Sequence, residues 1–203
     1  MTRRDFLSIV PAVVARTAAT VDVPVHIVTD GDAKITPHQF QHFWWTVWPE
    51  AVRDLARCRI RLETTSSTGG IWRPPSREPV ITGLERGVLN LVLTDRLPLE
   101  WDNGRMLSGV TTRYRGFHVC MIALRRAHGH QIPLLSVNTC VHELLHALMG
   151  DIFENRPPGF AGQAREFRID WYATRLWLTH TGGGIHDAAQ QYVQRLRPEG
   201  NRK

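Results

Sequence analysis

The sequence predicts a single α+β domain, both from its length and from the order of its strand and helix patterns. The 203 residues are 42% hydrophobic, which is enough to bury one core but short for two domains. Stretches with strand character fall in the first 124 residues, interrupted by one helix, and helical patterns follow them. Strands followed by a helical part are typical of the α+β class.

The chain begins with a predicted strand and a predicted helix. Residues 23–28 are rich in β-branched side chains that alternate in character, and the turn residues 30–32 end the strand. Thr36 can cap a helix, a proline occupies the first helical position, and Gln39 at the third position completes a capping box. We expect Pro49 to kink or restart this helix.

Three further strands are expected before the C-terminal part. Residues 51–58 continue the helical pattern, and residues 59–64 then alternate charged and apolar side chains, which indicates a second strand. Residues 66–79 are rich in Ser, Gly and Pro and predict a loop. The apolar runs 88–94 and 116–124 predict two buried strands.

The C-terminal part predicts three helices. The first begins near residue 136 or 138, where Ser and Asn can cap it, and ends at Gly150. The second covers about residues 162–178, and a short amphipathic helix covers about 187–196. The first helix has an apolar side for packing, made of Val141, Leu144, Leu145 and Leu148.

The first of these helices carries the residues of a metal site. His142 and His146 are four residues apart, so a helix places them one above the other and both can direct a ring nitrogen at one ion. Glu143 projects from the adjacent side, where its carboxylate can take a proton from a water on the same ion. This spacing predicts a zinc site.

A third ligand is available further along the chain. Glu166 and Asp170 lie one turn apart on the second predicted helix. The Gly- and Pro-rich loop before that helix can turn the chain back toward the histidines.

Residues 138–178 resemble the gluzincin metallopeptidases, the thermolysin-like group, in which His-Glu-x-x-His is followed by a helix carrying Glu-x-x-x-Asp. The resemblance implies that zinc is bound by His142, His146 and Glu166. It also implies that Asp170 hydrogen-bonds a ligating histidine and fixes its orientation.

The same resemblance implies a zincin-like fold. Such a fold has a small mixed sheet with an antiparallel edge strand, packed on the active-site helix and followed by a C-terminal helical part. The predicted strand 116–124 precedes the motif helix, where zincins carry the edge strand that pairs with an extended substrate.

The spacing after the motif argues against the metzincins, which are the nearest competing family. Their signature needs Gly three residues and His or Asp six residues after the second histidine, but Met149 and Ile152 occupy these positions. The third ligand is less determined by the sequence. Other carboxylates that could supply it are Asp151, Glu154 and Asp170.

These residues predict a zinc-dependent metallopeptidase that acts on a peptide or protein substrate. Glu143 would serve as the general base for a zinc-activated water. The sequence gives no basis for choosing among six candidates for oxyanion stabilisation, which are His118, His128, His130, Tyr172, His180 and His186. The alternative is an exported metal-binding or interaction domain that keeps the site but has no turnover.

Composition limits the other partners. The formal net charge is +6, but the basic residues are scattered and no helix-turn-helix, zinc-knuckle or RNA-recognition motif accompanies them, so we expect no nucleic-acid partner. No segment after the N-terminus approaches the roughly 20 apolar residues of a membrane span, and we expect a monomer.

Three cysteines without Cys-x-x-Cys spacing leave room for one bridge and a free thiol, and Cys140 is expected to be buried, facing away from the metal.

The N-terminus resembles a twin-arginine export signal of bacteria. Arg3 and Arg4 precede a short apolar stretch at 9–15 and a group of small residues. We therefore expect residues 1–19 to be a signal or tail, with cleavage after Ala19, and 20–203 to form one exported domain, periplasmic or extracellular.

Overall fold

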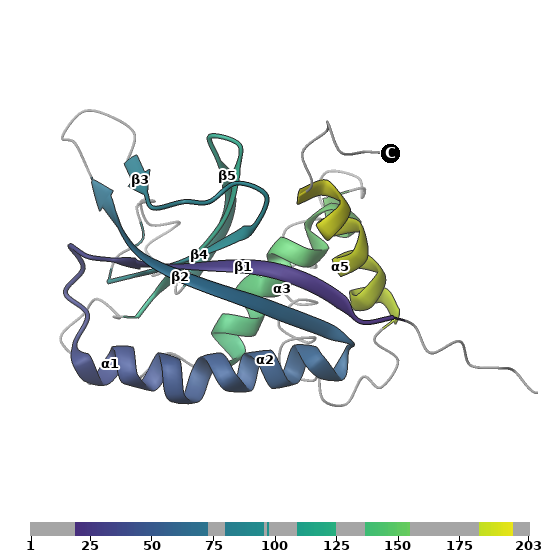
Figure 1. The fold of residues 1–203 in the computed structure, drawn as a ribbon, viewed down its shortest axis with the longest axis horizontal. Helices are drawn as coiled ribbons and strands as arrows, with labels where there is room; N and C mark the ends of the chain where they lie inside the picture. Colours follow the sequence, from purple (N-terminus) through teal and green to yellow (C-terminus); the bar gives the residue numbers. More distant parts are fainter. Residues whose placement is uncertain are drawn as a thin grey trace, which may run out of the picture.

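The computed structural model describes residues 19–72, 80–95, 97, 109–124, 137–154 and 183–196. It confirms the α+β class: a six-stranded mixed sheet curls over helices that pack on one of its faces (Figure 1). The strands are β1 (Val21–Asp30), β2 (Ile60–Trp72), β3 (Val80–Thr82), β4 (Leu89–Thr94), β5 (Gly109–Tyr114) and β6 (Phe117–Ala123). The helices are α1 (Pro37–His42), η1 (Phe43–Val47), α2 (Trp48–Arg57), α3 (Val137–Glu154) and α5 (Gly183–Leu196).

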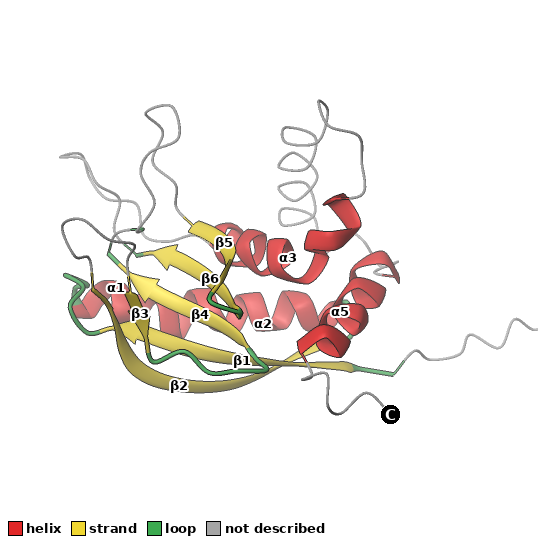
Figure 2. Ribbon diagram, turned by 90° about the horizontal axis from the view of Figure 1, so that it is seen from above, coloured by secondary structure: helices red, strands yellow, loops and turns green. Residues whose placement is uncertain are grey.

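The sheet has a parallel centre and antiparallel edges. Its strand order is β3-β2-β1-β4-β6-β5. β1 is parallel to β2 and β4, and β4 is parallel to β6. β3 and β5, at the two ends of the order, each run antiparallel to their neighbour (Figure 2).

One long helical segment connects β1 to β2. The predicted capping box is present, because the Gln39 amide lies 3.2 Å from the Thr36 hydroxyl and the Gln39 side-chain oxygen accepts from the Thr36 amide at 2.9 Å. Pro49 restarts the helix, as expected, since α2 has it in the first turn. The preceding turn, η1, is π-helical, and its wider geometry gives room to a proline ring that would clash with the carbonyl four residues earlier in an α-helix.

The loop predicted for residues 66–79 is wrong at its beginning, because β2 continues to Trp72. Its polar positions up to Gly69 belong in the sheet because β2 pairs with β1 along all of β1, and the hydroxyl of Ser67 has a partner there. Thr65 and Ser67 each place a hydroxyl oxygen 2.8 Å from a ring nitrogen of His26. Residues 73–79 lie outside the described part of the chain.

The prediction for the edge strand is also wrong. The predicted strand 116–124 corresponds to β6, which is an inner strand between β4 and β5. The antiparallel edge strand beside β6 is β5, for which no strand is predicted from the sequence although residues 110–112 are β-branched. A two-residue turn at Arg115 and Gly116 joins the two strands, and both residues have positive φ, 48° and 82°. This conformation matches the twist of a tight hairpin.

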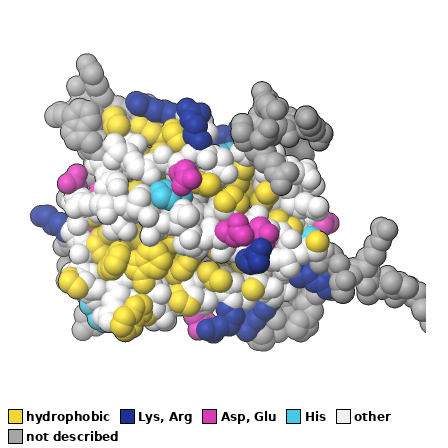
Figure 3. Space-filling model, viewed as in Figure 1, with side chains coloured by type: hydrophobic (Ala, Val, Ile, Leu, Met, Phe, Trp, Pro, Cys, Tyr) yellow, Lys and Arg dark blue, Asp and Glu magenta, His cyan; other side chains and the backbone are white. Residues whose placement is uncertain are grey.

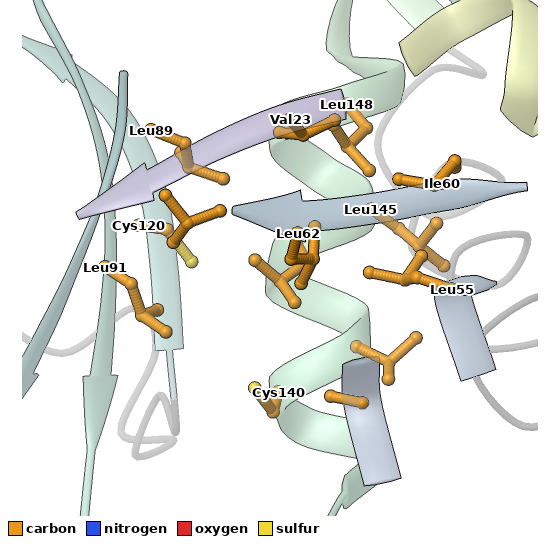
Figure 4. Packing of buried hydrophobic residues seen from close by; sticks show 14 of the residues in the cluster. Val23, Leu55, Ile60, Leu62, Leu89, Leu91, Cys120, Cys140, Leu145 and Leu148 are labelled. Carbon is orange, nitrogen blue, oxygen red and sulfur yellow. The ribbon is translucent and has the colours of Figure 1, made fainter. Parts of the chain in front are cut away.

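The main core lies between the sheet and the helices. In Figure 4, Leu145 and Leu148 of α3 point toward Ile60 and Val23 of the central strands and toward Leu55 of α2. The side chains of Ile60, Val23, Leu55 and Leu145 have no exposed surface. A smaller cluster covers the other face of the sheet, made of Val28, Ile71, Ile81, Val92, Tyr114, Val119 and Met121.

The C-terminal helices agree in part with the prediction. α3 extends four residues beyond Gly150, where we expected it to end, because a glycine inside a helix costs only about 1 kcal/mol. α5 begins at Gly183, four residues before the predicted tail helix. The predicted helix at 162–178 lies outside the described residues.

Candidate metal centre

Helix α3 is fixed to the fold by its apolar side. Besides Cys140, five of its described side chains are buried to 3% exposure or less: Val141, Leu144, Leu145, Leu148 and Met149. Burying each such side chain contributes about 1.5–3 kcal/mol relative to exposure. The helix therefore holds the remaining side chains of the motif in fixed positions relative to β5 and β6.

The two histidines of the motif converge. The Nε2 atoms of His142 and His146 are 2.9 Å apart, and the ring centroids are 4.6 Å apart. Two ring nitrogens on one tetrahedral zinc ion are separated by about 3.3 Å, given Zn–N bonds of about 2.0–2.1 Å. A small rotation of either ring reaches that separation, so the pair fits a zinc ion.

Glu143 lies between α3 and the edge strand. It is buried at 6% exposure, and its Oε2 atom lies 3.0 Å from the hydroxyl of Thr111 on β5. The same hydroxyl lies 3.0 Å from the backbone carbonyl of Glu143, so its single proton can be donated to either oxygen. Thr111 thus fixes the position of the predicted general base.

Gly109 permits this close approach of β5 to α3. A Cβ atom added at Gly109 would lie 2.6 Å from Oε1 of Glu143 and would overlap its Cγ and Cδ atoms. Any other residue would therefore push the carboxylate or the strand away. Neither Gly109 nor Thr111 was predicted from the sequence, in which a glycine before a short polar segment was the one signal available.

The cysteines are structural. Cys58, Cys120 and Cys140 are free and buried, so the bridge left open by the sequence does not form. Cys140 packs in the main core, as expected, and burial together with the charge of Glu143 raises the pKa of its thiol to about 12. Burial, then Glu143, also raises the pKa of Cys120, which a hydrogen bond with Thr111 partly opposes. Neutral thiols of this kind are poor metal ligands.

The predicted third ligand and its first alternative fall outside the described residues. This holds for Glu166 and Asp170, and within the described ranges no three His, Cys, Asp or Glu side chains gather around one point. Asp151 and Glu154 continue the backbone of α3 beyond the histidines.

Two of the six oxyanion candidates are described, and both pack elsewhere. The His118 ring packs edge-on against Tyr192 of α5. Nε2 of His186 lies 2.7 Å from the carbonyl oxygen of Ala19, the residue before the predicted cleavage point. His128, His130, Tyr172 and His180 lie outside the described residues.

Comparison with known proteins returns no match among family models, curated proteins or solved structures. Among the described residues, none of the helices combines the length and the apolar character needed to cross a membrane.

Proposed function

We propose that this chain is a zinc-dependent peptidase of zincin-like fold, with His142, His146 and Glu166 as metal ligands and Glu143 as general base. One observation carries the proposal. The two motif histidines converge to 2.9 Å on a buried helix, while the glutamate beside them lies against β5, the last strand of the described sheet. A pair of histidines that only filled the core would not require a carboxylate beside them.

The residues of the chain have distinct tasks in this proposal. Zinc, when bound, would supply acidity by lowering the pKa of water to about 7 and by polarising a carbonyl. Glu143 would accept the proton of the attacking water and deliver it to the leaving amine. Thr111 orients the Glu143 carboxylate through Oε2, and Gly109 keeps the strand close enough for that contact.

The edge strand supports a peptide substrate. Among the described strands, β5 pairs with β6 on one side and with none on the other, so its other edge can present backbone donors and acceptors. An extended peptide can add to such an edge, and Thr111 and Gly109 would then lie between the peptide and Glu143. This arrangement supports amide hydrolysis over reactions of small, non-peptide substrates.

Zinc stoichiometry tests the ligand set. We expect about one zinc per purified wild-type chain and loss of the metal in H146A and E166A. If zinc were retained in E166A but lost in D170A, Asp170 and not Glu166 would be the third ligand. A wild-type chain that takes up no zinc would remove the basis for the proposal.

E143Q separates the enzyme from a metal-binding domain without turnover. The variant should keep its zinc and lose peptide hydrolysis, because the amide cannot accept the proton. If hydrolysis by the wild type and by E143Q were equal over a peptide library, the exported binding domain would be the better description.

Export is a separate proposal. If residues 1–19 are a twin-arginine signal, mass spectrometry of the protein from its native host should find a mature chain starting near Thr20. An intact N-terminus in cytoplasmic fractions would contradict it.

A further inference from the structure

Basic side chains from three elements meet beside the edge strand. Arg113 of β5 and His118 of β6 are cross-strand partners. The His118 ring packs against the ring of Tyr192 on α5, with 5.2 Å between the ring centroids. Arg195 follows Tyr192 by three residues and so lies on the same side of α5. In Figure 3, basic side chains also lie at the margin where Figure 1 draws the β5–β6 hairpin.

These groups come together against their mutual repulsion. Burial lowers the pKa of His118, and the charges of Arg113 and Arg195 lower it further. Burial and Arg113 likewise lower the pKa of Arg195. Arg113 is exposed, whereas His118 and Arg195 are partly buried. Like charges held close to partly buried groups cost free energy, which a bound anion would offset.

Tyr192 adds an independent observation. Its side chain is 2% exposed, and its hydroxyl has no hydrogen-bond partner among the described residues. Burial and the neighbouring Cys120 raise the pKa of this hydroxyl and the charge of Arg113 lowers it, so the hydroxyl lies near the core as well as within the field of Arg113. A buried hydroxyl without a partner costs about 1–3 kcal/mol, and an oxygen of a bound carboxylate would satisfy it.

The cluster has a fixed relation to Glu143. Thr111 and Arg113 are alternate residues of β5, so they lie on the same face of the sheet about 6.6 Å apart. Thr111 contacts Glu143, and an extended peptide on β5 would have the same repeat. A side chain beside Arg113 would then be two residues from the one beside Thr111.

We propose that Arg113, His118, Tyr192 and Arg195 form a subsite for an acidic side chain of the substrate. In a peptide bound along β5, this acidic residue would lie beside Arg113, two positions from the peptide residue beside Thr111 and toward the carboxyl end of β5. Only this position relative to the scissile bond rests on the proposed peptidase function, since binding of the carboxylate needs no turnover.

A glutamate scan of peptides tests the subsite. The probes are fluorescent hexapeptides with blocked ends, each carrying one Glu at a different position, compared with Gln at the same position. Binding to the full chain is measured by anisotropy. At one position the Glu peptide should bind about tenfold more tightly than the Gln peptide, and R113Q and R195Q should each reduce this ratio to about twofold or less.

A matched control removes the effect of net charge. The chain carries a formal charge of +6, which attracts any acidic peptide. Arg53 on α2 is exposed and paired with Glu50 at 2.9 Å, so R53Q removes one positive charge elsewhere and should leave the ratio unchanged. R113K should keep part of the preference because it keeps the charge.

The outcomes distinguish the two proposals. Equal binding of Glu and Gln peptides at every position, or a preference that survives in both R113Q and R195Q, overturns the subsite whatever the zinc and cleavage assays give. A position-specific preference in a chain that cleaves none of the peptides supports the subsite and counts against the peptidase.

Discussion

Histidines in two regions of this molecule have opposite surroundings. His26, on the sheet face away from the helices, has a hydroxyl 2.8 Å from each ring nitrogen, from Thr65 and Ser67, and Glu85 lies 3.3 Å from Nδ1. His142 and His146 instead direct Nε2 at each other across 2.9 Å. A hydroxyl can donate or accept, so His26 is satisfied in either tautomer. The two facing Nε2 atoms can hydrogen-bond to each other only when one of them carries a proton and the other does not, and the same pair also suits a shared cation. The partners of the ring nitrogens, more than burial, separate a structural histidine from a ligand.

The largest expected effect is on zinc affinity. H142L should lower the affinity for zinc by more than about 100-fold. Loss of a residue that only hydrogen-bonds to a metal ligand already costs about 10–100-fold, and loss of the ligand itself should cost at least as much. H26L, the matched change in the other region, should bind zinc as the wild type does. Isothermal titration with Zn²⁺ measures both, and equal affinities in H142L and wild type would remove the distinction between the regions.

The next effect is on catalysis at the contact between β5 and α3. G109A places a methyl group against the Glu143 carboxylate, so we expect at least about tenfold lower kcat for peptide hydrolysis, from displacement of the base. The zinc content should stay at the wild-type level. G116A, at the hairpin turn, has no atom within 4 Å of the added Cβ and is the control, although its φ of 82° will cost some stability. Wild-type kcat in G109A would show that Glu143 is not where the base acts.

A smaller effect is expected on stability. H26L loses both hydroxyl contacts of the imidazole, which contribute about 1 kcal/mol each, so the free energy of unfolding should fall by about 1–2 kcal/mol. H142L should change it less, because His142 is only half-buried. Urea unfolding of the metal-free proteins gives both values, and the reverse order would contradict the assignment of His26 as structural.

The smallest effect concerns the pH dependence of stability. Burial, with Arg113 and Arg195, lowers the pKa of His118 below 6.5, so the unfolded chain takes up this proton before the folded chain does. Stability is therefore unaffected by His118 above pH 6.5 and falls as the pH drops below it. H118Q should lose less stability than wild type between pH 7 and pH 5 in thermal unfolding. H38Q, at an exposed histidine of α1, is the control, and parallel curves for H118Q and wild type would contradict the shift.

The sequence predicted those features of the fold that depend on residues close together along the chain. The capping box at Thr36, the restart at Pro49 and the helix that carries the motif all follow from local spacing. The edge strand did not follow, because the polar run at residues 111–113 has no alternating apolar face and becomes a strand by pairing with β6. The continuation of β2 through Ser66 and Ser67 likewise depends on β1. Gly109 could not be interpreted before the approach of Glu143 was known, and the role of Glu166 stays a prediction.

The π-helical turn η1 sets the phase of the helical segment that it interrupts. Gln39 and Leu55 are 16 residues apart, and a uniform α-helix would place them about 160° apart around its axis. Both are nevertheless buried: Leu55 packs in the main core, and Gln39 donates to the carbonyl of Leu124 at 3.0 Å. The extra residue in η1 corrects part of this rotation, so that both ends face the sheet. A chain shortened by one residue at 43–47 would keep its helicity but could orient only one end of the segment correctly.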